Sequence, residues 1–249
     1  MLISCLGFTH PHAGPYAGFI SAGDFIDAYY NKTVDNTHPQ NVSTQKGKVN
    51  RAESNTVGGI NGLGYQIGYR VPFGKDVFFF SGEFDYLFHG GSVYGNIEEE
   101  GTSEAPNQLG ESWSEQWTFQ RANSFGLALK LGASPGTLRS WKAGIYVLAG
   151  VRLAKSRLDA YYNGCFNPEP CGIGGYESGR ASKDFYSTAW TSGVGVEKKM
   201  GDDCWLEVEG RYTSFTKAKW ITPFPDLGVE VTSDLVTQSV DLRINVVFR

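Results

Sequence analysis

The chain has 249 residues, a formal net charge of −4 and a pI near 5.6. This mild acidity gives no reason to expect a nucleic-acid binder, which normally presents a clustered basic face. Hydrophobic residues (41%) and aromatic residues (14%) are too abundant for a disordered chain, and no run of about 18 apolar residues is present that could form a transmembrane helix. The class that these exclusions leave is an all-β protein rich in aromatic residues and in glycine, of which there are 32.

The first residues have the features of a targeting segment. A short apolar stretch leads to the small residue Ala13, which predicts that residues 1–13 are the remnant of a secretory signal peptide. No basic residue precedes this stretch, which suggests a true start site further upstream. We expect residues 14–249 to form one β-barrel domain.

Alternation of apolar and polar residues is the dominant pattern in the rest of the chain. Successive side chains of a strand point to opposite faces, so this period of two predicts strands with one apolar and one polar face. The last segment is the clearest, because Leu242, Ile244 and Val246 share one parity while Asp241 and Arg243 share the other. The eight expected strands are residues 15–30, 62–71, 77–89, 124–131, 141–153, 190–197, 204–217 and 236–248.

The connections between these strands alternate in length. Short links are expected at residues 73–75, 132–140 and 201–203, and long polar ones at residues 31–55, 90–117, 162–183 and 220–234. This order places all the long connections at one end of a meander, as in bacterial outer-membrane barrels. The predicted fold is therefore a closed eight-stranded antiparallel up-and-down transmembrane β-barrel with short periplasmic turns and long extracellular loops.

Alternation alone does not decide which face points inward, so a soluble lipocalin-like carrier of a small ligand is the alternative fold. The polar parity favours the membrane barrel, because glycines stand between its charged residues. Glycines weaken a strand, but inside a narrow eight-stranded barrel they leave room for ion pairs. We expect a polar network in the lumen, and neither a cofactor nor a metal site. The network comprises Asp24, Arg70, Glu83, Asp85, Lys130, Arg152, Glu197, Glu207, Glu209, Arg211, Asp241 and Arg243.

Several segments carry a family resemblance. They are Tyr-Ala-Gly at residues 16–18, Gly-Tyr-Gln-Ile-Gly-Tyr at 64–69, Gly-Val-Gly-Val-Glu at 193–197, Glu-Val-Glu-Gly-Arg-Tyr at 207–212 and the closing strand to Phe248. With them, residues 14–249 resemble the OmpA-like/opacity-type bacterial outer-membrane β-barrel superfamily. The resemblance implies a structural surface protein of the cell outer membrane with a plugged lumen, and adhesion or antigenic exposure through its long loops.

The same resemblance implies which partners to expect. They are outer-membrane lipid and lipopolysaccharide, a host or matrix protein at the loops, and the barrel-assembly machinery, which would read Phe248 as its C-terminal signal. A lipid A-modifying enzyme is a further alternative. His89 and Ser92 lie close together in the sequence, but a nucleophile also needs an oriented base and acid. We expect no catalytic residues and no enzymatic activity.

Two loop features complete the sequence-based predictions. Cys165 and Cys171 flank a short segment with two prolines, and this spacing favours a disulfide. The second long loop carries many carboxylates and no Lys or Arg. A solvated surface is the simpler interpretation, and a site for basic host proteins or divalent cations is the sharper one. These acidic residues are Glu98, Glu99, Glu100, Glu104, Glu111 and Glu115.

Overall fold

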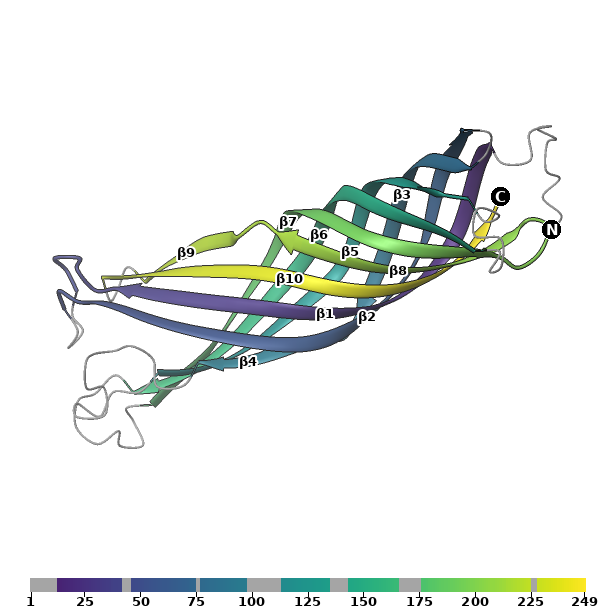
Figure 1. Ribbon diagram of the computed structural model, residues 1–249. Helices are drawn as coiled ribbons and strands as arrows, with labels where there is room; N and C mark the ends of the chain where they lie inside the picture. Colours follow the sequence, from purple (N-terminus) through teal and green to yellow (C-terminus); the bar gives the residue numbers. More distant parts are fainter. Residues whose placement is uncertain are drawn as a thin grey trace.

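The computed structural model describes residues 13–41, 46–74, 77–97, 113–134, 143–165, 176–224 and 228–249. In these ranges no helix has the length and apolar character needed to cross a membrane. Regular structure there consists of strands (Figure 1). They are β1 (Gly14–Asp35), β2 (Val49–Phe73), β3 (Phe78–Gly90), β4 (Val93–Ile97), β5 (Trp113–Ala133), β6 (Ala143–Cys165), β7 (Tyr176–Lys199), β8 (Cys204–Phe215), β9 (Ala218–Phe224) and β10 (Val229–Phe248).

Eight of these strands form a closed antiparallel ring in the order β1-β2-β3-β5-β6-β7-β8-β10. The ring closes where β10 pairs with β1, in a register that runs from Ala17 opposite Phe248 to Asp35 opposite Glu230. Closure leaves no unpaired edge at this level, which a strand surrounded by lipid requires. The predicted eight-stranded up-and-down barrel is confirmed.

The tight link between β2 and β3 lies where the sequence places it. Gly74 has a φ of +64°, a left-handed backbone conformation that glycine adopts without steric cost. The N–H of Val77 donates to the carbonyl of Gly74. Residues 201–203 likewise join β7 to β8, and Cys204 begins β8 without a disulfide partner in the described ranges.

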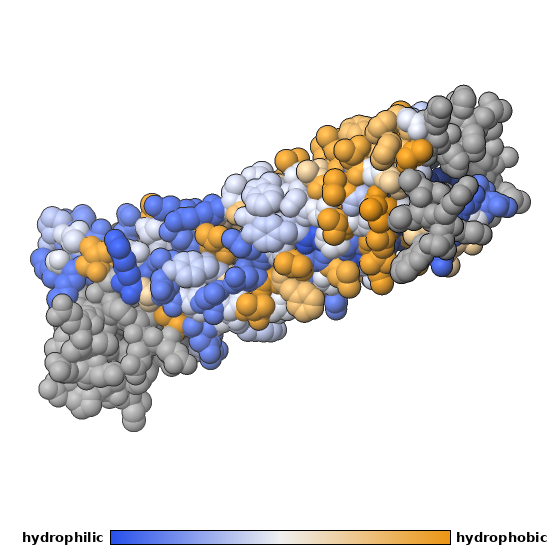
Figure 2. Space-filling model, in the orientation of Figure 1, coloured by the Kyte–Doolittle hydropathy of each residue, from blue (hydrophilic) through white to orange (hydrophobic). Residues whose placement is uncertain are grey.

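The outer face of the ring is apolar over the half of the barrel that contains Gly14 and Phe248 (Figure 2). Leu63, Val194 and Leu242 point outward there with 65%, 62% and 55% of their surface exposed. A soluble carrier would bury this face around its ligand, so the lipocalin-like alternative is wrong. Aromatic side chains, among them Tyr69 and Trp190, are exposed on the same face, as expected for interfacial positions.

Beyond this apolar belt, the strands continue into segments that the alternation pattern assigned to loops. β1 extends to Asp35, β6 to Cys165, and β7 already begins at Tyr176. Of the four long connections expected from the sequence, each is therefore shorter than predicted. The segment 220–234 contains part of a β9–β10 hairpin.

In this extension the ring divides into two sheets that face each other. One sheet is β9-β10-β1-β2 and the other is β4-β5-β6-β7, because β4 pairs only with β5 and β9 only with β10 in the described ranges. An apolar cluster fills the space between the sheets, with Ile26, Tyr30, Trp117, Phe119 and Leu158 among its buried members. Polar residues predominate on the face of the extension that Figure 2 shows. The strands thus bury their apolar side chains inward here and expose them outward in the belt.

Candidate functional site

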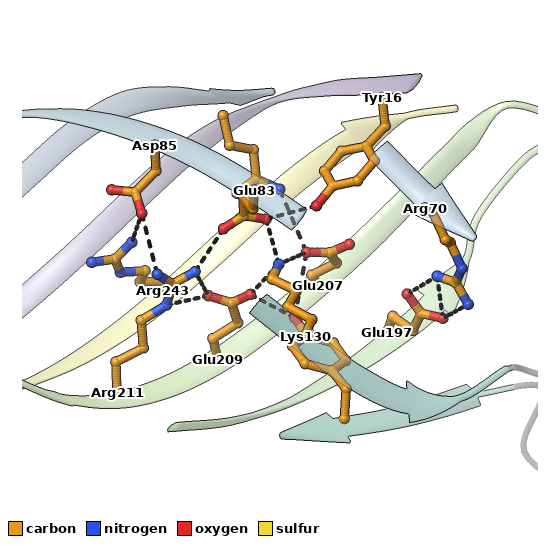
Figure 3. Close-up of polar contacts among 12 residues, drawn as sticks. Tyr16, Arg70, Glu83, Asp85, Lys130, Glu197, Glu207, Glu209, Arg211 and Arg243 are labelled. Carbon is orange, nitrogen blue, oxygen red and sulfur yellow. Dashed lines mark hydrogen bonds and ion pairs between the residues drawn. The ribbon is translucent and has the colours of Figure 1, made fainter. Parts of the chain in front are cut away.

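The interior of the belt is charged. All twelve residues of the expected lumen network are buried, ion pairs join most of them, and Figure 3 shows most of them. They come from β1, β2, β3, β5, β6, β7, β8 and β10, so every strand of the ring contributes.

Lys130 lies at the centre of this network. Its ammonium is 2.6 Å from a carboxylate oxygen of Glu83, 2.6 Å from one of Glu209 and 3.1 Å from one of Glu207. Oxygen atoms of these three carboxylates lie within 4.8 Å of one another, an arrangement that could hold a metal ion. The ammonium of Lys130 supplies the positive charge that they require (Figure 3).

A second set of ion pairs centres on the Asp85 carboxylate. Arg152 Nη2 donates to it at 2.6 Å, Arg211 Nη1 lies 3.2 Å from it and Arg243 Nη1 lies 3.5 Å from it. Arg243 also donates through Nε to Asp241 at 2.6 Å. Charged groups in a low-dielectric interior are stable only when they are paired and hydrogen-bonded, and this set provides such pairing.

Two arginines that were not predicted complete the network. At the end of the barrel near Phe248, Arg249 Nη2 lies 2.8 Å from Glu197 and 2.7 Å from Glu207. At the opposite end, Arg121 Nη1 lies 3.2 Å from Asp24. The predicted set contains five cations and seven carboxylates, and the two added arginines make it seven against seven.

The reason that these two arginines were missed is local. Lys130 points inward from an even-numbered position of β5, whereas Arg121 points inward from an odd one, because a β-bulge shifts the register between Arg121 and Asn123. Arg249 stands two residues after the buried Val247 and points inward as well. Extending the alternation by one residue beyond Phe248 would therefore have predicted it.

Glycines provide the space that these charged groups occupy. A Cβ at Gly126 would lie 2.9 Å from Asp85 Oδ2 and 3.0 Å from Arg152 Nη2. A Cβ at Gly144 would lie 2.9 Å from the Glu197 side chain. Each glycine therefore stands beside an ion pair that a larger residue would displace.

Near Arg121, a histidine lies between a serine and an aspartate, which is the arrangement of a serine-hydrolase triad. His89 Nε2 lies 2.8 Å from Ser124 Oγ, and His89 Nδ1 lies 3.3 Å from Asp24 Oδ2. Ser124 is completely buried, however, and its hydroxyl also accepts a hydrogen bond from Arg152 Nη1 at 2.7 Å. An acyl substrate needs space about 3 Å from the nucleophile, and the pocket beside these three residues is lined by His89 but not by Ser124. The three residues brace the lumen, and the absence of enzymatic activity stays a prediction.

One residue of the expected acidic loop is placed differently by the structure. Glu115 belongs to β5 and is buried, with Lys32 Nζ 2.5 Å from its carboxylate. The prediction of an exposed loop position was wrong for Glu115, because β5 begins before residue 117 and points this side chain inward. Glu98, Glu99, Glu100, Glu104 and Glu111 lie outside the described residues.

Other sequence predictions also fall at or beyond the limits of the described residues. Cys165 is the last residue of β6 and Cys171 lies outside those ranges, so their disulfide stays a prediction. The same holds for the signal peptide, because residues 1–12 lie outside them. Phe248 ends β10 with its side chain exposed on the outer face.

A closed antiparallel ring with an apolar exterior and a paired, charged interior defines a transmembrane β-barrel of the bacterial outer-membrane type. No protein-family model matches the chain, and no curated protein matches it.

Solved structures of outer-membrane and surface proteins are similar to the chain at low identity. OprG from Pseudomonas aeruginosa is 12% identical, with 96% of this chain and 97% of OprG covered and a TM-score of 0.44. Ail, the attachment invasion locus protein of Yersinia pestis, is 13% identical over 90% of this chain and 98% of Ail, with a TM-score of 0.26. Neisserial surface protein A is 15% identical over 91% and 96%, with a TM-score of 0.25. Because each of these TM-scores is below 0.5, the assignment of the fold rests on the strand ring and its two faces.

Proposed function

We propose that the protein is a structural surface protein of the bacterial outer membrane, in which a plugged barrel anchors a folded extracellular extension and its loops. The observation that carries this proposal is that buried side chains occupy the interior both within the apolar belt and in the extension. Charged pairs fill it inside the apolar belt, and the apolar cluster around Trp117 fills it in the extension. An eight-stranded barrel has room for little more than such side chains.

A plugged lumen predicts the absence of a porin-like channel. In planar-bilayer recordings, the purified protein is expected to produce no large, stable conductance step, because Arg211 and Lys130 bridge carboxylates on several strands across the lumen. A porin of known conductance, inserted in the same bilayer, is the control. A reproducible porin-sized step from this protein would contradict the plugged lumen.

In the proposed orientation the long connections face the outside of the cell, which supports a role in adhesion or as an antigen, since loops on a rigid scaffold commonly carry binding sites. The acidic run Glu98–Glu100 follows directly after β4 in the sequence, and β4 lies in the extension, away from Phe248. Its charge favours a basic host or matrix protein as the partner. Phe248, exposed where β10 ends, is in our proposal the residue that the assembly machinery reads.

Deletion of Glu98–Glu100 is expected to reduce the attachment of whole cells to surfaces coated with a basic protein, because it removes three negative charges from the loop. Cells that carry a deletion of similar size between β5 and β6, within residues 135–142, are the matched control. Proteolysis of intact cells, with cleavage within residues 98–112, would establish that the loop is outside. Unchanged attachment despite that cleavage would exclude the acidic loop as the adhesive site.

A further inference from the structure

A pocket of about 440 Å³ lies in the barrel wall where β3 ends and β4 begins. Ser92 lines it from the break between these strands, and Ala122 lines it from the bulge in β5. Gln120 and Arg157, also in the lining, are exposed on the outer face. The pocket therefore opens to the exterior of the barrel, although its lining also includes the lumen residue Arg121.

This pocket lies at the edge of the apolar belt. On β5 the outward side chains change from the exposed Leu127 and Phe125 to the polar Gln120, and on β6 they change from the exposed Val151 to Arg157. In a bilayer, the polar headgroup layer lies directly outside the hydrocarbon core. The pocket is thus placed at the depth of lipid headgroups.

The lining is rich in hydrogen-bond donors without partners. Arg121 Nε and Nη2 are buried and have no hydrogen-bond partner among the described residues, although Nη1 pairs with Asp24. Lys155 is half-buried in the lining, and no ion pair is found for it in the described part of the chain. Unsatisfied buried donors cost free energy, and the oxygens of a phosphate are the acceptors that match guanidinium and ammonium groups best.

Among the described residues, the carboxylates near the pocket neutralise Arg157 but not Lys155. Arg157 donates to Asp159 through Nε and Nη2 at 3.0–3.1 Å. These bonds lower the pKa of Asp159 to about 2, so Asp159 is ionised and neutralises Arg157. The lining carboxylate of Asp184 lies opposite Arg157 in the β6–β7 register, not beside Lys155.

We propose that this pocket binds the phosphate group of an anionic lipid headgroup in the outer leaflet, with Lys155 as its donor and the positive charge of Arg121 behind it. The inference rests on the proposed position of the barrel in the membrane. Free phosphate shares this chemistry, but the exposed apolar side chains of Phe125 and Val151 lie on the same two strands as the lining residues Ala122 and Lys155, toward the belt, and would contact acyl chains. This neighbourhood favours a lipid over a soluble ion.

Lipid retention by native mass spectrometry tests the proposal. The protein is reconstituted in neutral nanodiscs doped with phosphatidic acid or with diacylglycerol of the same chains, and the retained lipid is counted after release. We expect the wild-type barrel to retain phosphatidic acid preferentially. Lys155→Ala should reduce that preference about tenfold, because a charge-assisted hydrogen bond is lost. Lys198→Ala is the matched control, because Lys198 is exposed and lies near the end of β7, far along the chain from the pocket.

Heat-modifiable gel migration of each variant shows whether the barrel is folded and inserted, so failure of the site is distinguishable from failure of the proposed membrane fold. Equal retention of the two lipids by the wild type would overturn the proposal. So would equal losses for Lys155→Ala and Lys198→Ala. Inorganic phosphate, added as a third arm, should compete only weakly; if it displaces phosphatidic acid at equal concentration, the site binds a soluble anion and the lipid assignment is overturned.

Discussion

Replacement of Lys130 with methionine is expected to lower the free energy of unfolding by about 3–5 kcal/mol, the range observed when one partner of a buried ion pair is removed. Methionine keeps much of the length of the lysine side chain, so little packing is lost. What is lost is the single ammonium that lies within 3.1 Å of Glu83, Glu207 and Glu209. Three carboxylates, all buried, then remain close together with one positive charge fewer.

Urea titration of the protein folded in lipid vesicles measures this loss, with Lys198→Met on the exposed surface as the control. A second variant separates charge from packing. Adding Glu209→Gln to Lys130→Met removes one charge of each sign, and this double variant should recover part of the lost stability. If Lys130→Met costs no more than Lys198→Met, the lumen network does not stabilise the barrel.

The ring itself was predictable because lipid imposes a strict pattern on the sequence. A strand between hydrocarbon and a charged lumen must alternate, and the segment from Val240 to Phe248 does so with an exposed residue at every second position. The extension was not predictable in this way. There, Ile26 and Tyr30 are buried between two sheets, and the outward residues are polar, so the same strand exchanges the roles of its faces. A pattern search that expects one apolar face therefore stops too early.

Alternation also predicted only part of the lumen network. Parity along regular strands identified inward residues such as Arg211 and Asp241, because nothing interrupts β8 or β10 between them and the strand ends. The bulge in β5 changes which residues point inward on the N-terminal side of Asn123, from even-numbered to odd-numbered positions. No residue type in this segment indicates a bulge. Arg121 and the wall pocket both depend on that bulge, so neither could be derived from alternation.

Leu242→Arg is the second substitution for which we expect a large effect, about 2–4 kcal/mol of lost stability if the side chain faces the middle of the hydrocarbon. Leu242 is 55% exposed on the outer face, between Val240 and Ile244, which are exposed too. Its cross-strand neighbours are Gly23 and Gly210, and a Cβ added at either would meet nothing within 4 Å. The larger arginine therefore has room, and the expected cost comes from placing its charge in lipid rather than from a steric clash.

Val49→Arg provides the matched control, because Val49 is also about half exposed, at 49%, but begins β2 at the polar end of the barrel. There the arginine remains in water, and the change in unfolding free energy should stay within about 0.5 kcal/mol. Both variants are measured by urea unfolding from the same lipid vesicles. A cost at Leu242 as small as that at Val49 would mean that the exposed apolar belt is not in contact with hydrocarbon, and the orientation of the two faces would then have to be abandoned.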